Sequence, residues 1–156
     1  MKVFGICASP RNDTTYYVLT QALEKLESRN FETEIFTCHA RDIKPCMHCD
    51  YCLENKKCII QDDMGEVYEN LLRGKIGMSI TVGGDRTGGQ DFAHLANITY
   101  FMIHGIIPVS GGPFGSNLGA SFWSKDSIDE IRKDSYGMES LDRTLVEFEN
   151  FLNKYI

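Results

Sequence analysis

Residues 3–15 read VFGICASPRNDTT, and this stretch decides the fold class. The apolar run at residues 3–8 shows no polar alternation, which is typical of a strand covered on both faces in a parallel sheet. A polar turn follows, and apolar residues then recur at helical spacing from Val18 to Leu26. A strand, a polar turn and a helix in this order predict an α/β protein.

The polar turn also has the chemistry of a phosphate site. Free amides at the start of a helix point outward, and the helix dipole is positive there. The hydroxyl groups of Ser9, Thr14 and Thr15 and the guanidinium of Arg11 would complete such a site. The alternative is a helix that is simply well capped, since Asn, Asp and Thr are favoured caps. The turn lacks a GxGxxG pattern, so a dinucleotide is not favoured.

A second motif lies at residues 46–58, which hold four of the six cysteines at the spacing C-x2-C-x2-C-x5-C. Thiols at every third residue let one tight loop offer three ligands to an iron-sulfur cubane, so a [4Fe-4S] cluster is favoured. Zinc is the second possibility, although structural zinc sites usually draw on two CxxC pairs separated by a long loop. Thiols without a metal are the third, and disulfides between such close thiols would be strained.

The cysteine motif follows a predicted second strand at residues 31–37, where polar and apolar residues alternate as in a half-exposed edge strand. Both the motif and the polar turn therefore leave the carboxyl ends of parallel strands. Ligands of open α/β sheets bind at that rim. We expect the thiols and the phosphate turn to be neighbours.

Two more strands are predicted, at residues 75–82 and 106–109. Residues 83–90 contain four glycines and follow a strand, which favours contact with a flat ligand over a merely flexible loop. Amphipathic helices are expected at residues 62–72, 92–103 and 141–155.

A second glycine-rich loop is expected at residues 111–120. Phe122, Trp123 and Tyr136 are placed in an irregular segment beyond it, where aromatic side chains serve either an interface or the core. The four histidines have no metal-binding spacing and are expected to be solvated or structural. Cys7 and Cys38 lie in or next to strands and are expected to be core thiols.

Length and composition limit the function classes. A chain of 156 residues is expected to form one domain. Its net charge of -6 argues against nucleic acid as a partner. It has no apolar run long enough for a bilayer and no signal-peptide pattern, so no membrane is expected. Cysteines grouped as ligands fit a reducing cytoplasm.

Four stretches resemble the iron-sulfur flavoproteins of anaerobic archaea and bacteria, within the flavodoxin-like NAD(P)H-dependent FMN reductase superfamily. With their flanking helices they cover nearly the whole chain. They are SPRNDTTY at 9–16, PCMHCDYCLENKKCIIQDDM at 45–64, KIGMSITVGGDRTGGQ at 75–90 and PVSGGPFGSNLGASFWSKD at 108–126.

The resemblance implies a flavodoxin-like three-layer sandwich, with a parallel sheet of about four strands and helices on both faces. Residues 1–156 would form a single domain with a cysteine-rich cluster-binding loop at 45–58. The implied ligands of a [4Fe-4S] cluster are Cys46, Cys49, Cys52 and Cys58. The implied FMN phosphate ligands are Ser9, Arg11, Asn12, Thr14 and Thr15. The implied contacts of the flavin ring edge are Gly83, Gly84, Asp85, Arg86, Gly88, Gly89 and Gln90.

The implied activity is electron transfer, with electrons taken from a ferredoxin-like donor or NAD(P)H. An FMN-dependent oxidoreductase is favoured, and no catalytic side chain is expected because the cofactors carry the chemistry. The resemblance also implies a homodimer or homotetramer in which the cluster of one subunit lies near the flavin of another. The alternative is a flavin-less [4Fe-4S] or zinc-binding relay or structural module.

The chain departs from the family pattern after Gly74. A strand-helix unit of roughly thirty residues that the family carries there is absent, and its turn would lie against the flavin ring. The centre of the sheet is therefore expected to close up or to be filled by a partner chain.

Overall fold

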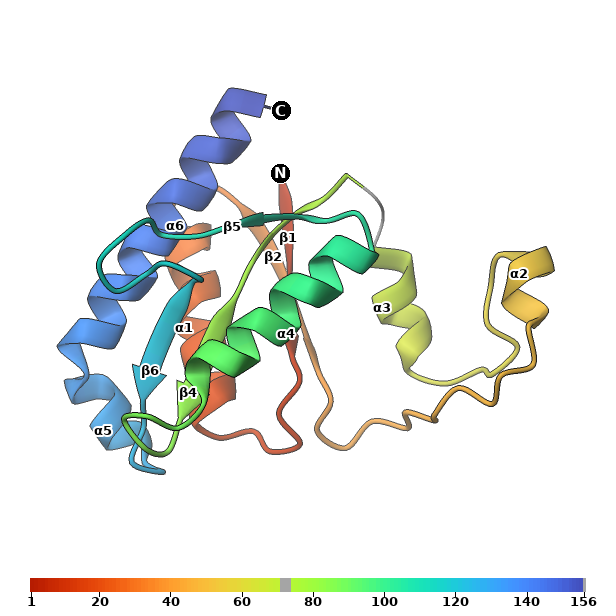
Figure 1. Cartoon of the computed structure of the whole chain (residues 1–156), viewed down its shortest axis with the longest axis horizontal. Coiled ribbons are helices and arrows are strands. Elements are labelled where there is room, and N and C mark those ends of the chain that lie inside the picture. The colour runs from red at the N-terminus through yellow and green to blue at the C-terminus, as the bar shows by residue number, and fades with distance from the viewer. Residues whose placement is uncertain (71–73, 156) are drawn as a thin grey trace.

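The protein is an α/β sandwich of helices and parallel strands (Figure 1). The computed structural model describes residues 1–70 and 74–155. The elements are β1 (Lys2–Cys7), α1 (Thr14–Glu27), β2 (Glu32–Thr37), α2 (Tyr51–Asn55), α3 (Met64–Asn70), β3 (Ile76–Met78), β4 (Ile80–Gly83), α4 (Gln90–Ile103), β5 (Ile107–Val109), β6 (Ala120–Trp123), α5 (Ile128–Lys133) and α6 (Ser135–Tyr155).

All strand pairs in the described residues are parallel. β1 pairs with β2, β3 with β5, and β4 with β6. Only Ser79 separates β3 from β4, so they form one interrupted strand, as do β5 and β6 around the excursion at residues 110–119. The described residues thus give the four strand positions predicted from the sequence. Among the strands that the structure describes, β2 pairs only with β1 and is an edge strand, as predicted.

The placement of Phe122 and Trp123 in an irregular segment was wrong. Both lie in β6, and Phe122 is buried in the core. The same placement was wrong for Tyr136, which lies exposed in the first turn of α6. The chain returns to the sheet after the glycine-rich excursion because every second residue of β6 points inward. These residues, Ala120 and Phe122, bury apolar surface. α5 was also not predicted, and α6 begins at Ser135, six residues before the predicted start.

The sheet is divided at its centre. In the described residues no ladder joins the β1–β2 pair to the other strands. β1 and β4 are the inner edges of the two parts, and α1 contacts both of them. The centre has therefore not closed into a continuous sheet. The division fits the expectation that a strand-helix unit is absent from the centre of the sheet. The predicted helix positions Leu71 and Leu72 lie outside the described residues.

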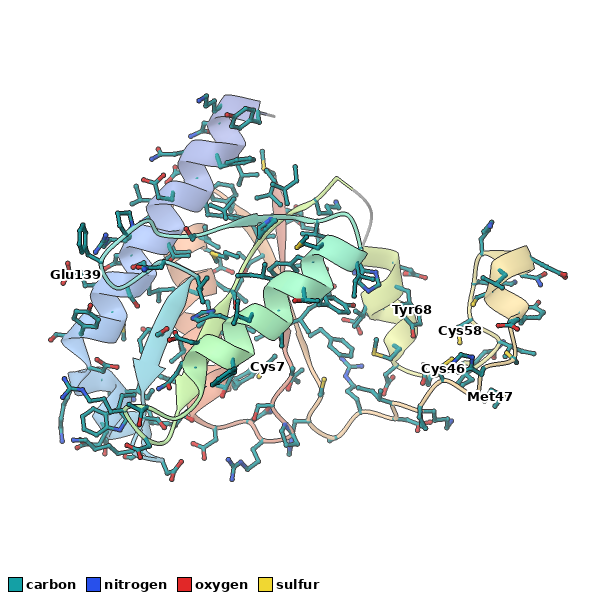
Figure 2. The ribbon with its side chains drawn as sticks, in the orientation of Figure 1. Cys7, Cys46, Met47, Cys58, Tyr68 and Glu139 are labelled. Carbon is teal, nitrogen blue, oxygen red and sulfur yellow. The ribbon has the colours of Figure 1, made fainter. Side chains whose placement is uncertain are left out.

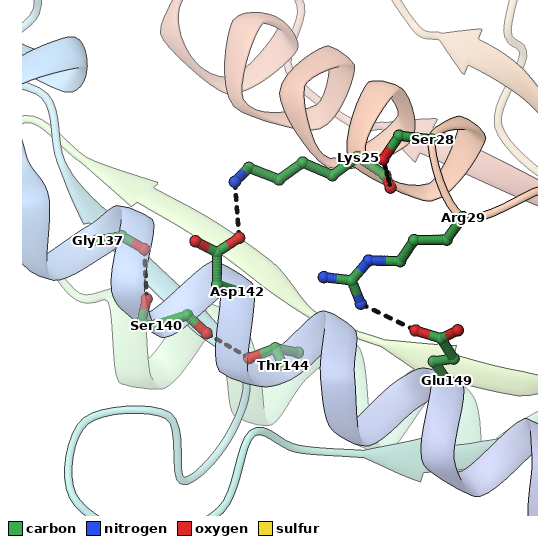
Figure 3. Close-up of polar contacts among 8 residues, drawn as sticks. All are labelled: Lys25, Ser28, Arg29, Gly137, Ser140, Asp142, Thr144 and Glu149. Carbon is green, nitrogen blue, oxygen red and sulfur yellow. Dashed lines mark hydrogen bonds and ion pairs between the residues drawn. The ribbon is translucent and has the colours of Figure 1, made fainter.

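α1 and α6 form the main core on one face of the sheet. Val18, Ala22 and Leu26 of α1 are fully buried with Leu141 and Leu145 of α6. Two ion pairs tie the same helices together at the surface, Lys25 to Asp142 and Arg29 to Glu149 (Figure 3). Partly exposed ion pairs of this kind contribute little, so burial of the apolar stripes carries the packing.

α4 covers the opposite face, as Figure 1 shows. The ring of Phe101 lies so close to Gly77 of β3 that a Cβ there would be 3.1 Å from it. The helix therefore sits directly on the strand, which favours glycine at position 77. No helix in the described residues is long and apolar enough to cross a membrane.

His94 fastens α4 to the sheet through a buried polar cluster. Its Nε2 lies 3.0 Å from the Thr81 hydroxyl and 2.9 Å from the Ser121 hydroxyl, and its Nδ1 lies 2.8 Å from the Ser79 hydroxyl. Burial lowers the pKa of the His94 imidazole. The expectation of a structural histidine is confirmed at this position.

We predict that Leu145→Ala lowers the free energy of unfolding by about 2 to 5 kcal/mol, because it leaves a cavity at a fully buried position. The matched control is Val146→Ala, which shortens a 43% exposed side chain on the same helix. That variant should lose less than about 1 kcal/mol. Urea unfolding followed by circular dichroism measures both. Equal losses would contradict the assignment of the buried face of α6.

His94 should also make the unfolding free energy depend on pH. Because its folded-state pKa is lowered, the unfolded chain takes up the proton first as the pH falls below about 6.5. The contribution of neutral His94 to the free energy of unfolding is fully present above that pH. It is lost as the pH falls through the folded-state pKa. His94→Gln should show a smaller loss than the wild type between about pH 7 and about pH 5 in urea titrations. Identical losses would exclude His94 as a source of the effect.

Candidate functional site

The start of α1 is open toward solvent at the end of β1. Tyr17 is the first residue whose amide bonds back to the preceding turn, at 2.9 Å from the Asp13 carbonyl oxygen. The earlier amides of the helix have no intrahelical acceptor. Asp13 is the N-cap residue but makes no side-chain cap hydrogen bond, and the first turn contains no acidic residue. The simple capped-helix alternative is therefore not what the structure shows, and the amides are available to an anion.

Two side chains of the predicted phosphate turn hold its shape. Ser9 Oγ accepts a hydrogen bond from the Arg11 amide at 3.2 Å. Asn12 Oδ1 accepts one from the Thr37 hydroxyl at 3.0 Å, which ties the turn to the end of β2. Arg11 is exposed. Its exposed guanidinium is accessible to a bound anion.

The glycine-rich segment 83–90 is a folded turn at the carboxyl end of β4. Gln90 Nε2 donates to the Asp85 carbonyl at 3.0 Å and to the Phe122 carbonyl at 3.2 Å. Gly89 has φ +84°, and a Cβ at Gly88 would lie 2.9 Å from the Asp85 carbonyl oxygen. The flexible-loop alternative is therefore disfavoured. The turn has a defined shape that requires glycine.

Trp123 extends this rim, although its role was not recognised from the sequence. Its indole N–H donates to the Gly84 carbonyl at 3.1 Å. Lys125 Nζ lies 4.6 Å from the centroid of the indole ring, and the Arg86 guanidinium lies 5.8 Å from it. These are cation–π distances. The sequence offered one signal for this role, an aromatic residue that follows a glycine-rich stretch. It did not reveal the partner, because Gly84 is 39 residues away from Trp123.

The cysteine motif lies on an arm, residues 39–63, that starts beside the phosphate turn. The Cys38 amide donates to the Cys7 carbonyl at 3.0 Å. The His39 ring nitrogen Nδ1 lies 3.0 Å from the Pro10 carbonyl oxygen. The base of the arm is closed where the Asp63 amide donates to the Asp42 carbonyl at 3.0 Å. The base of the arm and the phosphate turn are thus in direct contact.

The thiols themselves do not lie at the phosphate turn. Figure 1 shows that the arm carries α2 away from the body. Figure 2 shows Cys46 and Cys58 near each other on this arm, while Cys7 lies in the body. The expectation of neighbouring motifs therefore holds for the base of the arm but not for the thiols.

Cys46, Cys49 and Cys52 are exposed and Cys58 is half-buried. Within residues 1–70 and 74–155 no three Cys, His, Asp or Glu side chains lie close enough to share a metal ion.

The backbone around the thiols nevertheless suits thiolate ligation. His48 and Asp50 have φ of 55° and 56°, left-handed values that are uncommon for residues other than glycine. They bend the chain tightly between Cys46 and Cys52. The His48 amide lies 3.5 Å from Cys46 Sγ, and hydrogen bonds to sulfur are one means by which proteins tune iron-sulfur clusters. The donor set of four thiols on one short arm fits such a cluster.

Tyr68 of α3 lies between the arm and the body (Figure 2). Burial raises the pKa of its phenol, and the charges of Cys58 and Asp62 raise it further. Tyr68 therefore stays protonated at neutral pH, and its hydroxyl remains a hydrogen-bond donor.

Comparison with known proteins gives consistent results. The family model described as NADPH-dependent FMN reductase matches residues 1–71. An iron-sulfur flavoprotein of Archaeoglobus fulgidus is 40% identical over 190 residues, covering 97% of each chain. An iron-sulfur flavoprotein of Methanocaldococcus jannaschii is 38% identical, covering 99% of this chain and 98% of the relative. One from Methanosarcina thermophila is 26% identical, covering 92% and 91%.

The lengths of these alignments bear on the divided sheet. An alignment of 190 residues that covers 97% of a 156-residue chain requires roughly 40 residues in the relative that have no counterpart here. That difference is large enough to contain the absent strand-helix unit of roughly thirty residues. With 38 to 40% identity over nearly the full length of both chains, this chain belongs to the iron-sulfur flavoprotein family.

Proposed function

We propose that this chain is a redox protein that binds FMN and an iron-sulfur cluster and transfers electrons between a donor and an acceptor. The observation that carries the proposal is the open start of α1 at the rim from which the cysteine arm leaves. When bound, FMN exchanges one or two electrons and the cluster exchanges one at a time. The chain supplies binding, spacing and electrostatic environment.

The phosphate of FMN is assigned to the start of α1. The unpaired amides of the first turn and the helix dipole both favour an anion there. Arg11 contributes a positive charge, and the hydroxyls of Thr14 and Thr15 contribute hydrogen bonds. Ser9 and Asn12 act by holding the turn in shape, as their hydrogen bonds indicate.

The edge of the flavin ring is assigned to the glycine turn at residues 83–90. Glycines there allow the backbone to approach a flat ring closely. Gln90 holds the turn against β6, and Trp123 holds it through the Gly84 carbonyl. The turn is therefore pre-organised, which reduces the entropy lost when a ligand binds.

The cluster is assigned to the thiols of Cys46, Cys49, Cys52 and Cys58, and its type is proposed to be [4Fe-4S] from their spacing. Three of these thiols are on the outside of the arm. An exposed cluster would suit contact with a ferredoxin-like donor, and NAD(P)H is the other donor proposed. We propose a homodimer or homotetramer as the assembly and a reducing cytoplasm as the compartment.

A second candidate is a flavin-less cluster relay, which the divided sheet favours. The rim between β1 and β4 lacks a strand in the described residues, so one wall of a flavin site is missing there. Adding FMN to the apoprotein distinguishes the candidates. Quenching of flavin fluorescence at micromolar protein supports the first. Unchanged emission from a protein that retains iron supports the second.

We predict that Cys52→Ser loses the [4Fe-4S] absorbance and most of the bound iron, because a cubane needs its full set of thiolates. Iron analysis and the visible spectrum of protein purified without air measure this. Cys38→Ser is the matched control, because Cys38 is a half-buried thiol at the base of the arm and outside the motif. Full iron content in Cys52→Ser would show that the ligand assignment is wrong.

We predict that Arg11→Ala weakens FMN binding by about 1.5 to 3 kcal/mol, the contribution of a charged hydrogen bond to phosphate. Fluorescence titration of the apoprotein with FMN gives the dissociation constant. Arg29→Ala is the control, because Arg29 follows the opposite end of α1 and pairs with Glu149 (Figure 3). It should leave FMN affinity unchanged. Unchanged affinity in Arg11→Ala would remove the turn from the FMN site.

A further inference from the structure

The turn between β1 and α1 is held only weakly by its own backbone. Apart from the Asp13 carbonyl, which accepts from the Tyr17 amide, residues 8–13 make no backbone–backbone hydrogen bond in the described part of the chain. The shape of the turn therefore depends on side chains. One such contact is internal, from the Arg11 amide to Ser9 Oγ at 3.2 Å. Two further contacts come from outside the turn, at the end of β2.

Thr37, the last residue of β2, makes the first of these two contacts. Its hydroxyl donates to Asn12 Oδ1 at 3.0 Å and accepts a hydrogen bond from the His39 amide at 3.2 Å. The amide can only donate and the hydroxyl has one hydrogen, so the two bonds together fix the direction in which the hydroxyl points. The side chain of Asn12 is thus held against the end of β2.

His39 makes the second contact. Its ring nitrogen Nδ1 lies 3.0 Å from the Pro10 carbonyl oxygen. Because a carbonyl oxygen only accepts, Nδ1 must carry the hydrogen of this bond. Thr37 and His39 therefore hold the turn at Pro10 and at Asn12, the two neighbours of Arg11 in the chain.

The register of the sheet brings these residues together. Cys7 and Thr37 are partners in the parallel pair of β1 and β2, and the Cys38 amide continues the ladder to the Cys7 carbonyl at 3.0 Å. Both chain segments therefore leave the sheet at the same level. Figure 1 shows the turn after β1 and the start of the cysteine arm at the same rim. The contacts to the turn thus come from the neighbouring strand and do not depend on α1.

We propose that Thr37 and His39 are positioning residues for the phosphate of a bound flavin nucleotide. By fixing the backbone on both sides of Arg11, they hold the guanidinium and the open amides of α1 in one arrangement before the ligand binds. Such pre-organisation lowers the entropy lost on binding. This proposal rests on the proposed function for the identity of the ligand.

The consequence is selectivity for a phosphorylated flavin. Thr37 and His39 contact the turn assigned to the phosphate, whereas the flavin ring is assigned to the separate glycine turn at residues 83–90. A change at Thr37 or His39 should therefore weaken FMN and leave riboflavin, which has the same ring system without the phosphate, unaffected. A loss of general stability would weaken both ligands.

The test is a fluorescence titration of the full-length chain, freed of bound flavin, with FMN and with riboflavin. Thr37→Val removes the hydroxyl at similar side-chain size. It should raise the dissociation constant of FMN about 2- to 10-fold, as expected for one neutral hydrogen bond, without changing that of riboflavin. Thr37→Ser keeps the hydroxyl and should restore the affinity for FMN.

The second position is tested in the same way. His39→Phe lacks the ring donor and should weaken FMN by a similar factor. His39→Asn carries a side-chain amide that can still donate to the Pro10 carbonyl, so it should weaken FMN less. Asn12→Ala completes a double-mutant cycle with Thr37→Val. Because Thr37 acts through Asn12, the double variant should bind FMN about as well as Asn12→Ala alone.

Thr33→Val is the matched control. Thr33 lies four residues earlier on the same face of β2 and is half-buried, as Thr37 is. Its hydroxyl donates to the carboxylate of Glu27, at the opposite end of α1 from the turn. The same loss of a hydroxyl at this position should leave both affinities unchanged. Circular dichroism verifies the fold of every variant.

The outcomes separate this proposal from the proposed function. A wild type that binds FMN while Thr37→Val keeps full affinity would overturn the positioning role alone. Equal losses of FMN and riboflavin, a Thr37→Ser variant as weak as Thr37→Val, or an equal loss in Thr33→Val would overturn it as well. A wild type that binds neither flavin would contradict the proposed function, and this proposal with it.

Discussion

The packing of α1 beneath both parts of the divided sheet is the contact on which the rest of the structure depends. No ladder joins β1 to β4 in the described residues, and α1 contacts both strands. Its buried stripe of Val18, Ala22 and Leu26 joins the core that α6 completes. Because α1 begins where β1 ends, the same packing places the open amides of its first turn at the carboxyl rim, beside the glycine turn after β4. The stability of the site is thus coupled to that of the core.

Much of this arrangement could be predicted from local patterns. The unbroken apolar run at residues 3–8 and the helical spacing from Val18 to Leu26 predict β1 and α1, and parallel strands bring the loops after them to one rim. β6 could not be predicted in the same way. It is four residues long and follows a ten-residue excursion, and its pairing with β4 joins residues about forty positions apart. No short-range periodicity reports such a contact.

The candidate site likewise has features that local sequence patterns predict and features that they do not. Thiol spacing identifies the ligands, because ligand geometry constrains sequence separation directly. The direction of the arm is set by its base instead, where the Lys44 amide donates to Asp62 and the Asp42 amide donates to Asp63. The periodicity of α4 likewise predicts a helix but does not determine which face is exposed. The absent strand-helix unit accounts for the open centre of the sheet, and the greater length of the aligned relatives supports that absence.

The most direct test of the account is a cofactor analysis of the protein purified without air. Iron, acid-labile sulfide, zinc and flavin would be measured per chain on the same sample. The account predicts about four iron atoms with matching sulfide and one FMN per chain. A protein that contains neither iron nor flavin, or that carries zinc in place of iron, would contradict the claim that the arm and the start of α1 hold a redox pair.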